Sequence, residues 1–171
     1  MTDQPITGAT RRALDQPIAE ATGLPGGLYT EANFEMEHAR LFARRWVPVG
    51  VGANLPEPGD MMPVEIAGWC LLVVRTREGV LKCFHNICRH RAMKLVGEKC
   101  ARKRAIQCPW HSWTYDLDGR LIGTPMIGGD DTHTHRSFDA SRLGLKEVRS
   151  ARWLDYLFVN IDGAAPAFGD W

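Results

Sequence analysis

The chain has 171 residues, of which 44% are hydrophobic and 24% charged, and its formal net charge is +1. This length accommodates one domain, with or without an N-terminal arm. The near-neutral charge argues against nucleic acid or another polyanion as a partner. No apolar run is long enough to cross a membrane and no secretory signal opens the chain, so we expect a cytoplasmic protein. Five cysteines, an odd number, do not suggest a disulfide framework.

The first part of the chain is polar and then helical. Residues 1–28 contain three prolines and several glycines, which predicts an arm with little structure of its own. The next segment, residues 29–44, predicts a helix that Thr30 caps and that runs from Glu31 to about Arg44. We expect one face of this helix to pack against the core, formed by Phe34, Leu41 and Phe42.

Residues 45–162 form the predicted main domain, in which short β-type runs alternate with turn residues. We expect strands at residues 46–51, 62–66, 70–76, 80–85, 113–117, 120–122, 145–150 and 154–161. Asp118-Gly119 predicts a hairpin with a two-residue turn. Several short strands at close spacing predict a mostly β fold, an antiparallel barrel or sandwich.

Two short segments each pair one cysteine with one histidine. Cys88 and His90 form a C-x-H motif, and Cys108 and His111 form a C-x-x-H motif. Two thiolates and two imidazoles are the ligands of a Rieske-type [2Fe–2S] cluster, in which two histidines replace two cysteines on one iron. A structural zinc site with the same four ligands is the alternative. Zinc fingers usually keep the two cysteines together and the two histidines together, whereas each motif here mixes them.

With these residues in view, the chain resembles the Rieske domain of the alpha (terminal oxygenase) subunit of Rieske non-haem iron aromatic-ring-hydroxylating oxygenases. The resemblance covers residues 28–162 and is strongest at 86–91 and 108–115. It implies a Rieske-type antiparallel β-barrel or sandwich with a cluster-binding subdomain at about 84–122. It also implies that Cys88 and Cys108 hold one iron and that His90 and His111 hold the other. No catalytic residue is expected in this chain.

The motifs depart from the family at two positions. Ala92 and Ser112 stand where the family usually has glycine, and glycine is often required where φ is positive. Respiratory-chain Rieske proteins also carry an extra cysteine in each loop and a serine that donates to a bridging sulfide, and Trp113 stands in the place of that serine. Fewer donors to sulfur imply a potential toward the low end of the Rieske range, roughly −150 mV. We expect Trp110, Trp113 and Tyr115 to pack around the cluster rather than relay electrons.

Family alpha subunits continue into a catalytic domain, and residues 163–171 would lead toward it. That domain holds mononuclear Fe(II) by two histidines and a carboxylate. We therefore expect an electron-transfer domain of a mono- or dioxygenase, which hydroxylates or demethylates a small organic substrate with O2 and NAD(P)H-derived electrons. The chain as given is expected not to be catalytic alone. A stand-alone ferredoxin-like carrier is the alternative. A substitute iron site in the polar loop of Asp130, Asp131, His133 and His135 is disfavoured, because neighbouring ligands on one flexible loop are rarely preorganised.

The segment between the two motifs is strongly basic. Residues 89–104 hold seven Lys or Arg against a single acid, Glu98. Such a segment is suited to guide an acidic reductase or ferredoxin toward the cluster. Two other interpretations stay open: a solvated loop without a partner, and an interface with neighbouring alpha subunits, since the family forms trimers in which the cluster of one subunit faces the mononuclear iron of the next.

Overall fold

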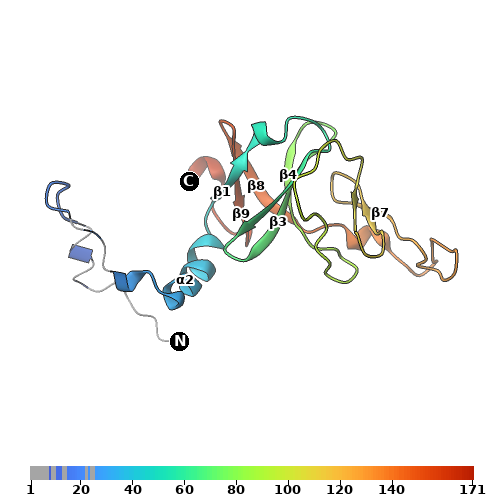
Figure 1. Ribbon diagram of the computed structural model, residues 1–171, viewed down its shortest axis with the longest axis horizontal. Helices are drawn as coiled ribbons and strands as arrows, with labels where there is room; N and C mark the ends of the chain where they lie inside the picture. Colours follow the sequence, from blue (N-terminus) through green and yellow to red (C-terminus); the bar gives the residue numbers. More distant parts are fainter. Residues whose placement is uncertain (1–7, 9–10, 13–14, 22, 24–25) are drawn as a thin grey trace.

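The computed structural model describes residues 8, 11–12, 15–21, 23 and 26–171, so half of the expected arm, residues 1–28, lies outside the described residues. A six-stranded antiparallel sheet forms the body of the protein, in the order β1-β9-β8-β4-β3-β2 (Figure 1). Its strands are β1 (Val47–Val51), β2 (Met61–Ile66), β3 (Trp69–Arg75), β4 (Leu81–His85), β8 (Glu147–Trp153) and β9 (Tyr156–Asn160). The predicted mostly β fold is confirmed.

The edges of this sheet carry the two prolines found within strands. Pro48 lies in β1 and Pro63 in β2, the two outer strands of the order. Proline has no N–H to donate to a neighbouring strand, so an edge is where a strand tolerates it. The two prolines also make the free edges poorer templates for pairing with another chain.

Strand β3 is buried on both faces and separates two hydrophobic clusters. Leu72 and Val74 point into one cluster and Leu71 and Val73 into the other, as the period of two along a strand requires. The first cluster also contains both motif cysteines, Cys88 and Cys108, while the second fills the space enclosed by the curled sheet. The motif cysteines therefore lie in a packed core.

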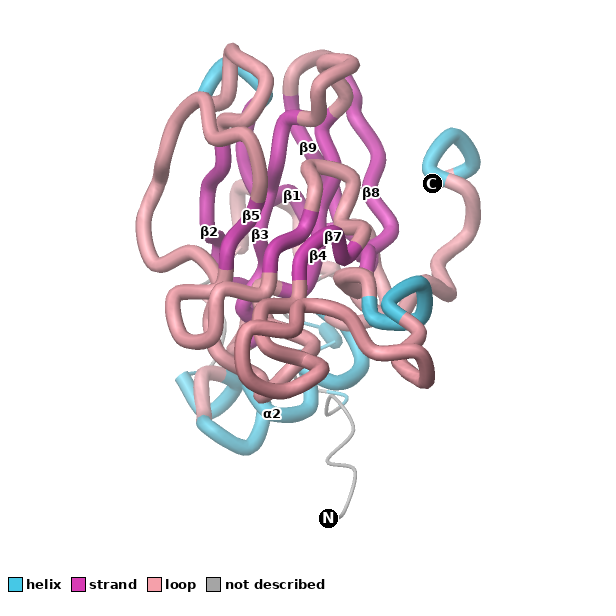
Figure 2. The backbone as a smooth tube through the Cα atoms, turned by 90° about the vertical axis from the view of Figure 1, so that its right-hand side faces the viewer, coloured by secondary structure: helices cyan, strands magenta, loops and turns pink. Residues whose placement is uncertain are grey.

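A small three-stranded sheet holds the second motif. It consists of β5 (Ile106–Gln107), β6 (Thr114–Tyr115) and β7 (Leu121–Gly123). Figure 1 shows β7 to the side of the large sheet, and in Figure 2, which is viewed from that side, β5 and β7 lie in front of it. The predicted hairpin at Asp118-Gly119 is present, but its turn is longer than two residues. The backbone of Asp116 pairs with Arg120, and Gly119 takes a left-handed conformation with φ +83°.

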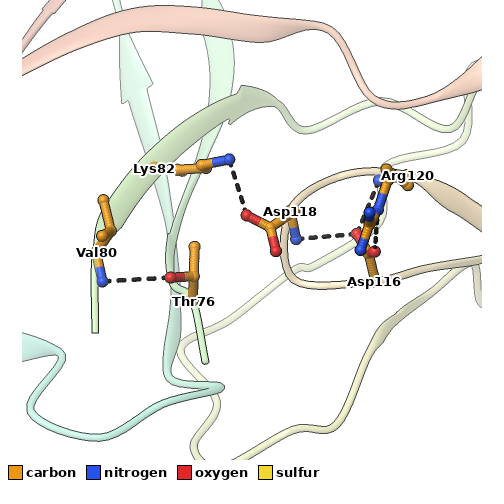
Figure 3. Close-up of polar contacts among 6 residues, drawn as sticks. All are labelled: Thr76, Val80, Lys82, Asp116, Asp118 and Arg120. Atoms are coloured by element: carbon orange, nitrogen blue, oxygen red, sulfur yellow. Dashed lines mark hydrogen bonds and ion pairs between the residues drawn. The ribbon is translucent and has the colours of Figure 1, made fainter. Parts of the chain in front are cut away.

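The β6–β7 turn fastens the small sheet to β4 (Figure 3). Lys82 forms an ion pair with Asp118 at 2.8 Å, while Asp116 accepts hydrogen bonds from the Asp118 and Arg120 backbones. The pair raises the pKa of Lys82 above its ordinary value through its hydrogen bond to Asp118. The carbonyl of Gly119 also accepts a 2.7 Å hydrogen bond from the Leu145 backbone. The β6–β7 turn is thus held to β4 by an ion pair and to Leu145 by a backbone hydrogen bond.

The helix preceding the sheet differs from the prediction. It begins as α2 (Glu31–Glu37), continues as a π-helical turn (His38–Phe42), and is capped by Thr30, which accepts a 3.3 Å hydrogen bond from Asn33 N. The expected buried face is wrong: Phe34 is 45% exposed and Leu41 46%. The helix projects from the sheet (Figure 1), and a ring stack between His38 and Trp69 at 3.8 Å links the two.

Short 3-10 turns complete the described chain, at Gly26–Leu28, Gly52–Asn54, Ala140–Leu143 and Phe168–Asp170. None of the five cysteines forms a disulfide bond in the structure. Within the described ranges, no helix has the length and apolar character that a membrane span requires.

Candidate metal centre

The two motifs fold into loops with the same hydrogen bonds. In the first, the backbone of Ala92 donates to the Cys88 carbonyl at 3.0 Å, and Cys88 donates to Met93 at 2.8 Å. In the second, Ser112 donates to Cys108 at 3.1 Å, and Cys108 donates to Trp113 at 2.8 Å. The fifth and sixth residues of each loop therefore return to its cysteine. Each loop is closed by its own backbone.

Both loops carry a residue with left-handed backbone at the same position. Ala92 has φ +56° and Ser112 has φ +55°. These are the two positions where the sequence departs from the family's glycines, and glycine adopts this conformation without the Cβ clash that other residues meet. The backbone takes the left-handed conformation at both positions although neither residue is glycine, so both residues carry backbone strain.

The cysteines and histidines differ in their surroundings. Cys88 and Cys108 are each 2% exposed, whereas His90 and His111 are partly exposed. The two imidazole rings meet edge to face with centroids 4.8 Å apart, and His90 stacks on the buried ring of Trp113 at 4.7 Å. Burial, then the neighbouring His111 and Arg91, lowers the pKa of His90, which favours the neutral form that binds metal.

The donor set has the composition of a Rieske-type site. Two thiols and two imidazoles are the ligands that a two-iron cluster of this type requires, two on each iron. The Nδ1 atom of His90 is buried and has no hydrogen-bond partner in the described chain. Such an atom is costly unless an unseen partner satisfies it, and iron is a suitable partner.

Tyr115 belongs to the site in a way that the sequence did not reveal. Its hydroxyl is buried, lies 3.3 Å from Cys88 Sγ, and accepts a 3.0 Å hydrogen bond from the Arg89 backbone. Because Arg89 occupies a lone pair, the phenolic proton is free to donate to the thiolate. Burial, followed by the bond to Cys88, raises the pKa of Tyr115 well above its ordinary value, so the proton stays in place. A donor to sulfur is therefore present beside the first loop.

Two buried polar side chains fix the basic segment that joins the loops. The amide of Asn86, which is fully buried, exchanges two hydrogen bonds with the Val96 backbone at 2.7 and 3.0 Å. The carboxylate of Asp60 accepts from the backbones of Arg102 and Glu57, both at 3.0 Å. These residues lie at the end of β4 and the start of β2, so the large sheet holds the connecting segment in place. Sequence reasoning assigned neither of them a role.

The polar loop that carries His133 and His135 is bonded within itself. His133 Nδ1 accepts a 3.1 Å hydrogen bond from the Met126 backbone, and His135 Nδ1 lies 2.7 Å from Ser137 Oγ. Both histidines are exposed, as are Asp130 and Asp131. Among the described residues, this loop included, no three His, Cys, Asp or Glu side chains are grouped so as to hold a metal ion. The disfavoured substitute iron site gains no support.

A packed β domain whose two matched loops present two buried cysteines and two partly exposed histidines defines a Rieske-type protein. The Rieske [2Fe-2S] domain family matches residues 45–138, and the chain belongs to this family. It is homologous to the alpha subunits of Rieske oxygenases, as its motifs had indicated. The [2Fe–2S] cofactor follows from the family. The binding of this cofactor by the four motif residues stays a prediction.

The relatives include oxygenase subunits of several substrate classes. The chain is 32% identical to the glycine betaine monooxygenase oxygenase subunit of Chromohalobacter salexigens, over 92% of this chain and 38% of the relative. It is also 32% identical to the carnitine monooxygenase oxygenase subunit of Escherichia coli K12, over 88% and 39%. The quaternary ammonium Rieske monooxygenase CntA, solved with γ-butyrobetaine, superposes with a TM-score of 0.76 at 29% identity, over 88% and 42% of the two chains. The chain thus spans about two-fifths of these relatives' length.

Proposed function

We propose that this chain is the electron-transfer domain of a Rieske oxygenase that acts on a quaternary ammonium compound. The observation that carries the electron-transfer role is the pair of matched loops, which bury two thiols and leave two imidazoles at the surface. A bound [2Fe–2S] cluster supplies one-electron transfer there. The chain's own residues hold it: Cys88 and Cys108 on the enclosed side, and His90 and His111 on the side nearer solvent.

The substrate class rests on the relatives. Two oxygenase subunits named for glycine betaine and carnitine are 32% identical to this chain, whereas the biphenyl dioxygenase alpha subunit of Metapseudomonas furukawaii is 28% identical. This favours a quaternary ammonium substrate over the aromatic ring that the motif resemblance suggested. The test measures the consumption of glycine betaine or carnitine by the protein expressed from the complete gene, supplied with NADH and a reductase. Naphthalene is the comparison substrate. Turnover of naphthalene alone would reverse the assignment.

The rim around the histidines suits a protein partner. Trp110 is 57% exposed and its ring lies 4.5 Å from that of His111, and Ile87 and Met93 beside the first loop are also exposed. Exposed apolar side chains around a redox centre favour contact with another protein. We assign this rim to the electron acceptor, a mononuclear iron domain of the same or a neighbouring subunit.

The basic segment suits the electron donor. Its exposed cations, Arg91, Lys94, Lys99, Arg102, Lys103 and Arg104, take part in none of the ion pairs seen among the described residues, and Arg77 joins them through a hydrogen bond to the Arg104 carbonyl. Asn86 and Asp60 hydrogen-bond to the backbone of the segment, so its cations are attached to an ordered backbone. An acidic reductase or ferredoxin would be steered to it. Lys99→Glu with Lys103→Glu should slow reduction by the donor, whereas Arg152→Glu at the β8–β9 hairpin should not.

Electron paramagnetic resonance tests the central proposal. The purified protein should show no cluster signal as isolated and a mixed-ligand [2Fe–2S] signal after dithionite. Cys88→Ser and His90→Cys should abolish or alter that signal. A colourless protein with one tightly held zinc would overturn the electron-transfer role and favour a structural-zinc interaction module. We also propose a cytoplasmic location, because none of the five cysteines is paired in a disulfide bond.

A further inference from the structure

Two buried side-chain nitrogen atoms in the described chain have no hydrogen-bond partner, and they belong to neighbouring residues. One is His90 Nδ1, which a metal ligand explains; the other is Arg89 Nε. A guanidinium N–H is always a donor and always charged, so leaving it buried without an acceptor is costly. Because the two residues are neighbours in the first ligand loop, a group bound at that loop is the natural candidate for the partner of both atoms.

Arg89 differs from every other cation in the basic segment. The remaining six are exposed, whereas Arg89 is partly buried and lies between the ligands Cys88 and His90. Its backbone N–H donates to the Tyr115 hydroxyl, which in turn lies 3.3 Å from Cys88 Sγ. None of the ion pairs in the described chain includes Arg89. The residue is therefore bound into the ligand loop and has no carboxylate to neutralise it.

We propose that Arg89 is a tuning residue whose Nε–H is reserved for the sulfur atoms of the cluster. This rests on the proposed function, since it requires the iron–sulfur group. A cluster gains negative charge on reduction, and hydrogen bonds and net charge around its sulfurs set its potential. An enclosed positive donor stabilises the reduced form more than a solvated charge at similar distance, because the surrounding dielectric is lower. Arg89 thereby raises the midpoint potential.

The test compares Arg89→Met with Arg91→Met in cluster-loaded protein. Both remove one cation next to His90, but Arg91 is exposed and Arg89 Nε is not. We expect Arg89→Met to reduce the one-electron equilibrium constant for reduction about tenfold, a fall of about 59 mV. Arg91→Met should change it less than about threefold, and that change should vanish in 1 M salt, where the screening length is about 3 Å. The Arg89 effect should persist in 1 M salt.

A second readout separates tuning from simple packing. In the reduced wild type, electron–nuclear double resonance should show an exchangeable proton coupled to the cluster that Arg89→Met and Arg89→Lys both lose. If Arg89→Met fails to load iron, the midpoint potential is measured on Arg89→Lys instead. This variant keeps the positive charge but removes the Nε–H donor.

Several results would overturn the proposal. Equal shifts for the Arg89 and Arg91 variants, or an Arg89 shift that salt abolishes, would make Arg89 an ordinary surface charge. If the Arg89→Met and Arg89→Lys variants keep the exchangeable proton signal, that proton belongs to a water or to another chain and not to Arg89 Nε. A wild-type protein that binds no iron would contradict the proposed function itself. Iron and sulfide are measured first, so this outcome is distinguished from a failure of the Arg89 proposal alone.

Discussion

The hydroxyl oxygen of Tyr115 lies 3.3 Å from the Sγ atom of Cys88, on a strand that arrives 27 residues later in the chain. This contact couples the small sheet to the first ligand loop. It also provides a hydrogen-bond donor to the cysteine sulfur, distinct from the serine donor that respiratory-chain Rieske proteins have and this chain lacks. A potential near −150 mV stays a prediction, and Tyr115 and Arg89 both act to raise it.

Tyr115→Phe should lower the midpoint potential while leaving the cluster bound. Loss of one hydrogen bond, worth about 1 kcal/mol, corresponds to about 40 mV for a single electron. A redox titration followed by visible circular dichroism measures the shift. Tyr156→Phe is the matched control, since Tyr156 is half exposed and lies on β9. Equal potentials for wild type and Tyr115→Phe would show that the hydroxyl does not donate to the thiolate.

Ala92→Gly and Ser112→Gly should each stabilise the protein. Both residues have φ near +55°, where a non-glycine residue costs about 1–2 kcal/mol, partly offset by the greater freedom of glycine in the unfolded chain. We expect each variant to raise the free energy of unfolding by about 1 kcal/mol in urea. Ala151→Gly, in the middle of β8, should lower it instead. A loss of stability in all three variants would refute the strain argument.

Gly119→Ala should be far more damaging than Gly79→Ala. Both glycines have φ near +80°, but a Cβ at Gly119 would lie 2.6 Å from Phe84 Cε1, whereas one at Gly79 would meet no atom within 4 Å. We expect about 1 kcal/mol of destabilisation at Gly79 and about 3 kcal/mol at Gly119, where overpacking adds to the backbone strain. Urea unfolding measures both variants. Equal losses would mean that the β6–β7 turn does not pack tightly on β4.

Stability should fall at alkaline pH because of Cys83. Burial raises the pKa of this thiol from 9.0 to about 12, so the folded state resists ionisation while the unfolded state does not. The contribution is complete below pH 9 and is lost as the pH rises from 9 toward 12, by about 1.4 kcal/mol per pH unit. Cys83→Val should flatten this slope between pH 9 and 10.5, measured as the urea midpoint. An unchanged slope would assign the alkaline loss to other groups.

The ligands were predictable from sequence because their chemistry is local. A cysteine and a histidine two or three residues apart reach one cluster from a single loop, so spacing alone identified Cys88, His90, Cys108 and His111. The family and cofactor are confirmed, whereas the binding by these four residues remains a prediction that the loop geometry supports. The strands were also predictable from local sequence, because the short apolar runs of β3 and β4 are visible in the chain between turn residues.

The supporting residues could not be predicted, because they act across long separations. Asp60 reaches Arg102 over 42 residues and Tyr115 reaches Cys88 over 27. No periodicity reports such contacts. The helix prediction failed for a different reason: Phe34 and Leu41 show the spacing of a buried face, yet both side chains are nearly half exposed. Periodicity identifies an apolar face but not whether a partner surface is present.

The closure of each ligand loop by its own backbone has a consequence for how the protein matures. The hydrogen bonds that close the loops, from Ala92 to Cys88 and from Ser112 to Cys108, join backbone atoms of the same loop. We therefore expect the loops to close before any iron is delivered. Apoprotein made in iron-starved cells should then accept a preassembled cluster without first unfolding.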